Sequence, residues 1–72
     1  MTELKASMAG NVWKVNVEVG DAVTKGDQVV ILESMKMEIP IESSVDGSVK
    51  EVKVNEGDFI NEGELVVIIE SN

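Results

Sequence analysis

The chain carries one stretch of sequence twice, as GNVWKVNVEVGDAVTKGDQVVILE at residues 10–33 and as GSVKEVKVNEGDFINEGELVVIIE at residues 47–70. At an offset of 37 residues, 11 of the 24 aligned pairs are identical, and the intervening residues 34–46 have no counterpart in this alignment. Two copies are too few for a solenoid, which stacks several units to bury a continuous core. We therefore predict a closed fold with pseudo-twofold symmetry.

Both copies carry the signals of short β-strands. Apolar and polar residues alternate from Trp13 to Val19, which is the period of a half-buried strand. Glycine-containing turn signals recur between such runs, and no window has a helical period. The continuous apolar runs Val29–Leu32 and Val66–Ile69 are predicted to be the most deeply buried strands. These patterns predict an all-β fold of seven or eight short antiparallel strands, arranged as a small sandwich or flattened barrel.

Three kinds of residue have a predicted place in this fold. Pro40 cannot donate to a β-ladder and is expected in an edge strand or at an irregularity. Trp13 is expected to be largely core or to cover one sheet. Acidic residues beside the repeated glycines are predicted to form turns and not to bind calcium, because the spacing of a calcium loop is absent. These residues are Asp21, Asp27, Asp58 and Glu64.

The composition is that of one small domain covering residues 1–72, and it excludes several functions. Without His, Cys, Arg or Tyr, the common catalytic nucleophile and base constellations cannot be assembled, so we expect no enzyme activity and no metal site. The net charge of -8 argues against nucleic-acid binding. No segment reaches the roughly 20 apolar residues needed to cross a bilayer, and no secretory signal is evident. We expect a soluble cytoplasmic protein that is monomeric when isolated.

The segment between the copies contains Glu33-Ser34-Met35-Lys36-Met37-Glu38. Met35, Met37, Ile39 and Ile41 would share the inward face of a strand, which would turn Lys36 outward. An exposed lysine between two methionines presents a primary amine beside soft apolar side chains, and such an amine can be acylated. By itself, this short motif is equally compatible with an ordinary solvated lysine.

The lysine motif and the repeat together resemble the biotinyl/lipoyl attachment domain family, from about Ala6 to Glu70. The family usually has Ala at the position of Ser34. The resemblance implies two quasi-symmetric four-stranded sheets, with an acceptor lysine on a tight hairpin at about residues 34–38 and both termini at the opposite end. Because the two halves align without a gap, it also implies a carrier without the protruding thumb of some members. Met8–Val15 resembles the small free-standing members of bacilli, although an excised domain remains an alternative.

The resemblance implies a function as a carrier of biotin. A biotin protein ligase would attach biotin to Lys36, and the chain would then move a carboxyl group between a biotin carboxylase and a carboxyltransferase. Glu33, Ser34, Met35 and Met37 would flank the acceptor and contribute to its recognition. Two alternatives stay open. Lipoate could occupy Lys36, although lipoyl domains usually place Asp before the lysine and Ala after it, or the chain could be an unmodified β-scaffold that binds other proteins.

Overall fold

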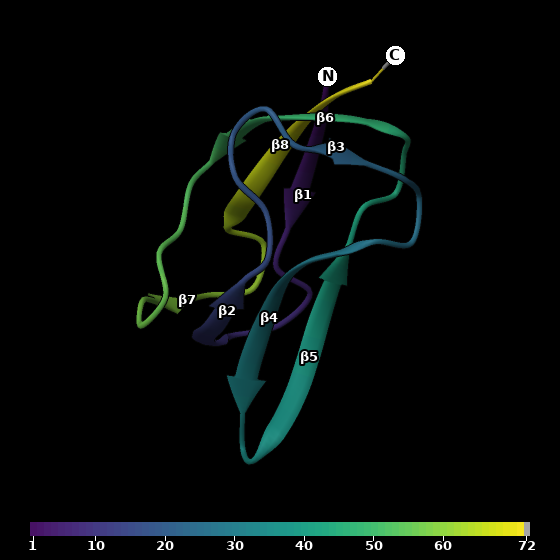
Figure 1. Cartoon of the computed structure of the whole chain (residues 1–72). Helices are drawn as coiled ribbons and strands as arrows, with labels where there is room; N and C mark the ends of the chain where they lie inside the picture. Colours follow the sequence, from purple (N-terminus) through teal and green to yellow (C-terminus); the bar gives the residue numbers. More distant parts are fainter. Residues whose placement is uncertain (72) are drawn as a thin grey trace.

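The computed structural model describes residues 1–71 as an all-β structure of eight strands (Figure 1). The strands are β1 (Thr2–Lys5), β2 (Gly10–Val15), β3 (Ala22–Val23), β4 (Gln28–Ser34), β5 (Met37–Glu42), β6 (Gly47–Val52), β7 (Phe59–Ile60) and β8 (Leu65–Ser71). They form two four-stranded antiparallel sheets, with the orders β1-β8-β6-β3 and β5-β4-β2-β7. The predicted all-β fold of two four-stranded sheets is confirmed.

The two sheets are related by the internal repeat. Adding four to each strand number, and subtracting eight where the sum exceeds eight, converts the order β1-β8-β6-β3 into β5-β4-β2-β7. The equivalence therefore includes β1 and β5, which lie outside the 24 aligned pairs. Leu4 and Ile41 are buried at equivalent positions, as are Ala6 and Ser43. The expectation that all of residues 34–46 lack a counterpart is wrong, because the two edge strands match in burial and pairing with few identical residues.

The core lies between the sheets and is built mainly from the two central strands. Val29, Val30 and Leu32 of β4 have no exposed surface, and neither do Val66, Val67 and Ile69 of β8. Burial of each such side chain contributes about 1.5–3 kcal/mol, so the two apolar runs make a large contribution to stability. Both runs were predicted as the deepest strands. Ile31 and Ile68 are the exceptions, because they are half-buried and point outward from their sheets.

Four acidic side chains close four equivalent turns. The carboxylates of Asp21, Asp27, Asp58 and Glu64 accept hydrogen bonds from the backbone N–H groups of Glu18, Thr24, Asn55 and Asn61, at 2.8, 2.9, 2.9 and 2.9 Å. The glycine before each of them has a positive φ of 85° to 97°, which residues with a side chain rarely adopt. The predicted role in turn formation is confirmed. Within residues 1–71, no group of three or more His, Cys, Asp or Glu side chains could hold a metal ion.

Two further predictions have different outcomes. Pro40 lies in the edge strand β5, as expected of a residue without a backbone donor. Trp13 is 48% exposed and lies outside the core, so of its two expected places, in the core or over one sheet, only the second is compatible with the structure. It follows Val12 at an irregularity in the pairing of β2 with β4, and this shift in register places both Trp13 and Lys14 on the surface.

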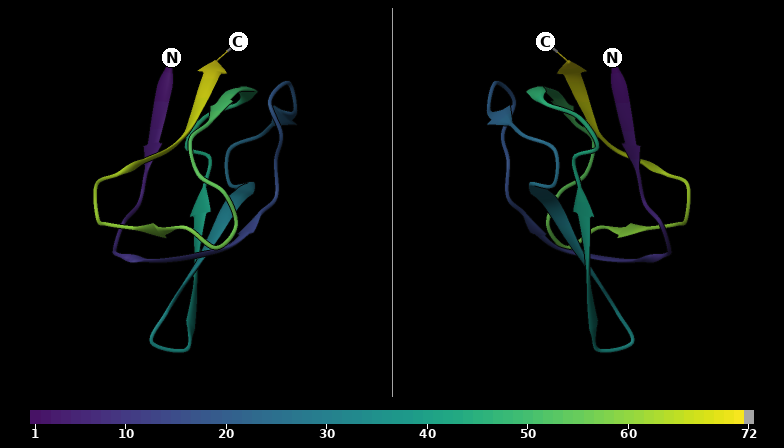
Figure 2. Two further views of the ribbon diagram at one scale, coloured as in Figure 1. Left: turned by 90° about the vertical axis from the view of Figure 1, so that its left-hand side faces the viewer. Right: turned by 90° about the vertical axis from the view of Figure 1, so that its right-hand side faces the viewer.

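The molecule is elongated, with principal extents of 36, 18 and 18 Å. The N and C termini lie together at one end, and the β4–β5 hairpin protrudes from the other (Figures 1 and 2). No segment of residues 1–71 forms a helix that could span a lipid bilayer. The fold therefore isolates one two-stranded hairpin at the end farthest from the termini.

Candidate functional site

Lys36 lies in the two-residue turn of this hairpin. Ser34 of β4 pairs directly with Met37 of β5, which leaves only Met35 and Lys36 to reverse the chain. Their φ angles are 52° and 67°. Positive φ at both central residues is the requirement of a type I′ turn, whose twist matches that of the flanking strands. Lys36 thus belongs to the turn and not to a strand, and strand alternation is not the reason for its exposure.

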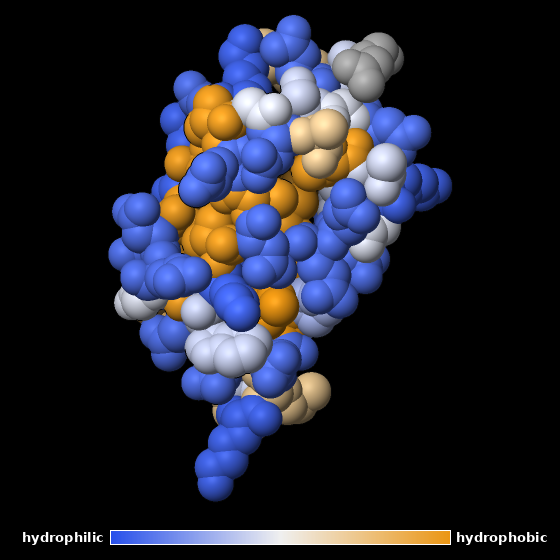
Figure 3. Space-filling view, in the orientation of Figure 1, coloured by the Kyte–Doolittle hydropathy of each residue, from blue (hydrophilic) through white to orange (hydrophobic). Residues whose placement is uncertain are grey.

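The side chain of Lys36 is exposed, and none of the ion pairs found within residues 1–71 includes it. In the space-filling view, hydrophilic atoms extend farthest from the body of the protein at the hairpin end (Figure 3). A lysine carries its amine on a flexible four-carbon chain. The amine is therefore presented to solvent and is accessible to a second protein.

Met35 and Met37 flank the lysine and are also exposed. Their exposed fractions are 91% and 64%, and neither belongs to the hydrophobic core. The sequence pattern assigned both residues to an inward strand face, and this assignment is wrong. The inward face of β5 begins with the half-buried Ile39 and continues with the buried Ile41. Large apolar side chains without a packing role are available to touch an attached group or a partner.

Glu33 and Ser34 form the base of the hairpin. Ser34 is half-buried, and its Cβ would lie 3.4 Å from a Cβ built on Gly10 of β2. Glu33 is exposed and lies directly opposite Glu38 across the β4–β5 ladder. The structure therefore brings together all five residues that the sequence selected. The structure adds Glu38. This residue ends the stretch Glu33–Glu38, so its position in the sequence could have indicated it.

The hairpin offers one strong nucleophile for a stable covalent linkage, the amine of Lys36. Its other polar groups are the carboxylates of Glu33 and Glu38 and the hydroxyl of Ser34. An amine reacts with an activated acyl group to give an amide, and it needs no second catalytic residue on its own chain if an enzyme supplies the activation. The site is suited to being modified by an enzyme.

Comparison with known proteins agrees with this geometry. Residues 2–69 match the family model described as biotin-requiring enzyme. The biotin/lipoyl attachment protein of Bacillus subtilis (strain 168) is 71% identical over 34 residues, which are 47% of this chain and 47% of that protein. The biotinylated protein TB7.3 of Mycobacterium tuberculosis (strain ATCC 25618 / H37Rv) is 51% identical over 39 residues, which are 54% of this chain and 55% of that protein.

A solved structure has the same fold over almost the whole chain. The crystal structure of Kluyveromyces lactis urea carboxylase matches 96% of this chain with a TM-score of 0.91 and 35% sequence identity, although the matched part is only 6% of that enzyme. The aligned stretches also span only about half the length of the two curated relatives, at 47% and 55%. The resemblance seen in the sequence is confirmed: the chain belongs to the biotin-requiring enzyme family and is a biotin-attachment domain homologous to the biotin carrier domains of carboxylases.

Proposed function

We propose that Lys36 is the residue to which a biotin protein ligase attaches biotin, and that the chain carries a carboxyl group between a biotin carboxylase and a carboxyltransferase. The observation that supports this proposal best is the position of Lys36 in a two-residue turn with positive φ at both residues. The turn is at the tip of a hairpin remote from the termini. Such a hairpin can enter an active site without the rest of the domain.

Attachment would form one amide bond. The Lys36 amine would attack the acyl carbon of biotinyl-adenylate, the bond from that carbon to the phosphate oxygen would break, and AMP would leave as the nitrogen loses its proton. Among residues 1–71, Lys36 has no ion-paired carboxylate beside it that would act as the base. The ligase would therefore supply both the activation and the proton acceptor.

The residues of the hairpin fit biotin. The exposed thioether side chains of Met35 and Met37 provide apolar surface beside the amine. Bound biotin supplies a ring nitrogen that accepts and releases a carboxyl group. The β4–β5 ladder fixes the position of the turn, and the lysine side chain acts as a flexible tether that raises the local concentration of the attached group at each active site. In this role the chain is a carrier and not itself a catalyst.

Lipoate is the second candidate for the same amine. The name of the Bacillus subtilis relative includes both groups, and lipoate would also be attached through an amide. The methionine on each side of Lys36 and the biotinylated mycobacterial relative both favour biotin.

The test is the intact mass of the protein after co-expression with a biotin ligase and, separately, with a lipoyl ligase. We expect a single biotin adduct on the wild-type protein and on the control Lys50→Arg, which alters an exposed lysine of β6. Lys36→Arg should gain no adduct. Absence of an adduct under both conditions would overturn the proposal, and a lipoyl adduct alone would transfer it to lipoate.

A further inference from the structure

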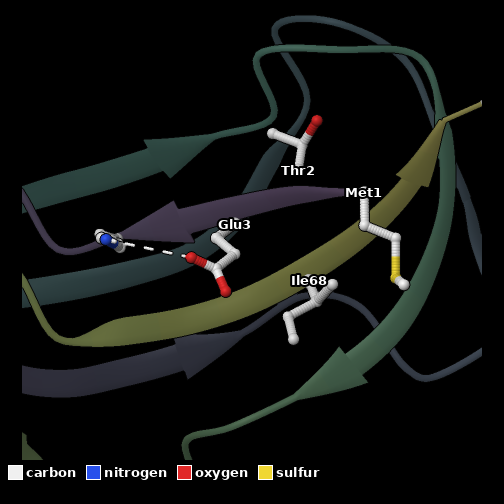
Figure 4. A pocket seen from close by; sticks show the side chains of 5 residues that line it. Met1, Thr2, Glu3 and Ile68 are labelled. Atoms are coloured by element: carbon white, nitrogen blue, oxygen red, sulfur yellow. Dashed lines mark ion pairs between the residues drawn. The ribbon is translucent and has the colours of Figure 1, made fainter.

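The internal repeat makes each sheet a control for the other, and the outer faces of the two sheets differ. On the β1-β8-β6-β3 sheet, charged residues are paired: Lys5 with Glu3 at 4.0 Å, Lys50 with Glu70 at 4.0 Å, and Lys53, next to β6, with Glu51 at 2.7 Å. Figure 4 shows the first pair beside Ile68 on this face. The hydrogen bond from Lys53 lowers the pKa of Glu51. None of the ion pairs found within residues 1–71 joins residues of the other sheet.

The β5-β4-β2-β7 sheet instead exposes both aromatic residues of the chain. Trp13 of β2 is 48% exposed and Phe59 of β7 is 62% exposed. Phe59 pairs directly with Asn11, two residues before Trp13, so the aromatic side chains lie on neighbouring strands. At an offset of 37 residues, the counterparts of Trp13 and Phe59 are Lys50 and Ala22. The fold therefore needs no aromatic residue at either position.

The same comparison explains why none of the ion pairs found within residues 1–71 includes Glu33. On the first sheet, Lys50 forms an ion pair with Glu70. The equivalent positions on the second sheet hold Trp13 and Glu33, so the lysine that would neutralise Glu33 is replaced by an aromatic side chain. Glu33 also lies directly opposite Glu38, and like charges directly opposite each other destabilise a sheet.

One exposed residue from each of the four strands of this sheet belongs to a continuous row. Phe59 of β7 pairs with Asn11 of β2, Asn11 pairs with Glu33 of β4, and Glu33 pairs with Glu38 of β5. The next pair along the β4–β5 ladder is Ser34 with Met37, after which the chain turns at Lys36. The row therefore lies beside the turn that presents the amine, and a protein that grips the turn can cover it.

We propose that the outer face defined by Trp13, Phe59, Glu33 and Glu38 is the docking surface for enzymes that act at Lys36. The complementary enzyme surface carries an arginine or lysine that pairs with Glu33 and Glu38, and an apolar side chain that contacts Trp13 and Phe59. Phe59 and Glu33 are two strands apart, so the two features are separated by about 10 Å. A second copy of the chain does not fit, because it would oppose the same acidic pair in a chain of net charge -8. The inference rests on the proposed function, since the partner must reach Lys36.

The test places residues of the first sheet at the equivalent positions of the second sheet. Trp13→Lys with Phe59→Ala gives the second face the residues that the first already holds at these positions, so the fold should be retained. We expect an unchanged melting temperature and full modification of Lys36 with excess ligase. With purified biotin ligase, biotin carboxylase and carboxyltransferase assayed separately, at least one enzyme should show a KM raised about tenfold with little change in kcat. The matched control, Lys50→Ala on the first face, should leave every KM unchanged.

A second variant removes the two carboxylate charges without changing the size of the side chains. Glu33→Gln with Glu38→Gln should raise the same KM and weaken its dependence on salt, because ionic strength screens a charge pairing that the variant no longer makes. Three results would each overturn the inference. The KM of all three enzymes could be unchanged by both face variants, or Lys50→Ala could raise KM equally. The wild-type protein could also self-associate in a way that Trp13→Lys with Phe59→Ala abolishes. Calorimetric titration of the three enzymes against Lys36→Arg, with and without the face substitutions, separates the two proposals. A missing adduct on the wild-type protein contradicts the proposed function, whereas binding unaffected by the face substitutions contradicts this inference.

Discussion

Ser34 pairs directly with Met37, and the chain reverses between them in only two residues. Both turn residues, Met35 and Lys36, have positive φ, although two-residue turns of this type usually hold Asn and Gly. For residues with a side chain, the left-handed conformation costs roughly 1–2 kcal/mol each. The hairpin thus keeps a methionine and a lysine at positions that stability alone would assign to other residues. This conformational cost is consistent with a role of these side chains in function.

Relief of this conformational cost should stabilise the fold. Met35→Asn is expected to raise the free energy of unfolding by about 0.5–1 kcal/mol, because asparagine tolerates positive φ better than methionine. Urea denaturation measures the change. Met37→Asn is the matched control, because Met37 lies in β5 and is not among the residues with positive φ. A decrease in stability for Met35→Asn would show that the turn does not carry the inferred cost.

The two buried glycines that begin β2 and β6 should respond unequally to alanine. A Cβ on Gly47 would overlap the backbone oxygen of Glu70 and lie 2.9 Å from Ile69 Cγ2 and Ser71 Cα, whereas the nearest atom to a Cβ on Gly10 is Glu33 O, at 3.0 Å. We expect Gly47→Ala to cost about 2–3 kcal/mol, and Gly10→Ala about 1 kcal/mol, because the closer contact forces the backbone apart. Each kcal/mol corresponds to about 4–8 °C in the melting temperature of so small a domain. Equal melting temperatures would contradict the difference in packing.

The turn carboxylates should each contribute modestly to stability. Asp27→Ala removes the acceptor for the Thr24 N–H, and we expect a loss of about 1 kcal/mol in the free energy of unfolding. Glu62→Ala serves as the control, since Glu62 is exposed and makes none of the four turn hydrogen bonds. Chemical denaturation of both variants decides the point: indistinguishable midpoints would mean that glycine alone determines these turns.

The exposed methionines should matter for transfer and not for folding. Met37→Ala is expected to change the free energy of unfolding by less than about 0.5 kcal/mol and to slow carboxyl transfer. Leu32→Ala, at a position with no exposed surface, should by contrast cost about 2–5 kcal/mol. Thermal melting and a transfer assay on the modified proteins separate the two effects. A large fall in the melting temperature of Met37→Ala would show that its side chain packs more tightly than its exposure indicates.

Much of this fold follows from the repeat and from the spacing of apolar residues. The identical Gly-Asp steps and the runs at residues 29–32 and 66–69 predicted the turns and the central strands correctly. A glycine turn depends on local backbone conformation, and a continuous apolar run has to be removed from water in any fold of the chain. The equivalence of β1 and β5 was missed because burial of Leu4 and Ile41 needs only similar residues, which an alignment of identities does not detect.

The details of the site were harder to predict from residue patterns. The hairpin turn lacks the Asn and Gly that usually signal it, so alternation placed Met35 and Met37 on a buried strand face. Only the family resemblance indicated a tight turn there. The exposure of Trp13 depends on a shift in register between β2 and β4, and such a shift leaves no mark in the hydrophobic pattern.

In the proposed function, the amine at the second position of this turn is the acceptor for biotin. The most direct measurement is the intact mass of three proteins after reaction with purified biotin ligase: wild type, Lys36→Arg, and Met35→Lys with Lys36→Met, which moves the amine by one position within the turn. We predict one biotin on the wild type and none on either variant. A biotin adduct on Lys36→Arg, or a wild-type protein that remains unmodified, would show that Lys36 is not the acceptor.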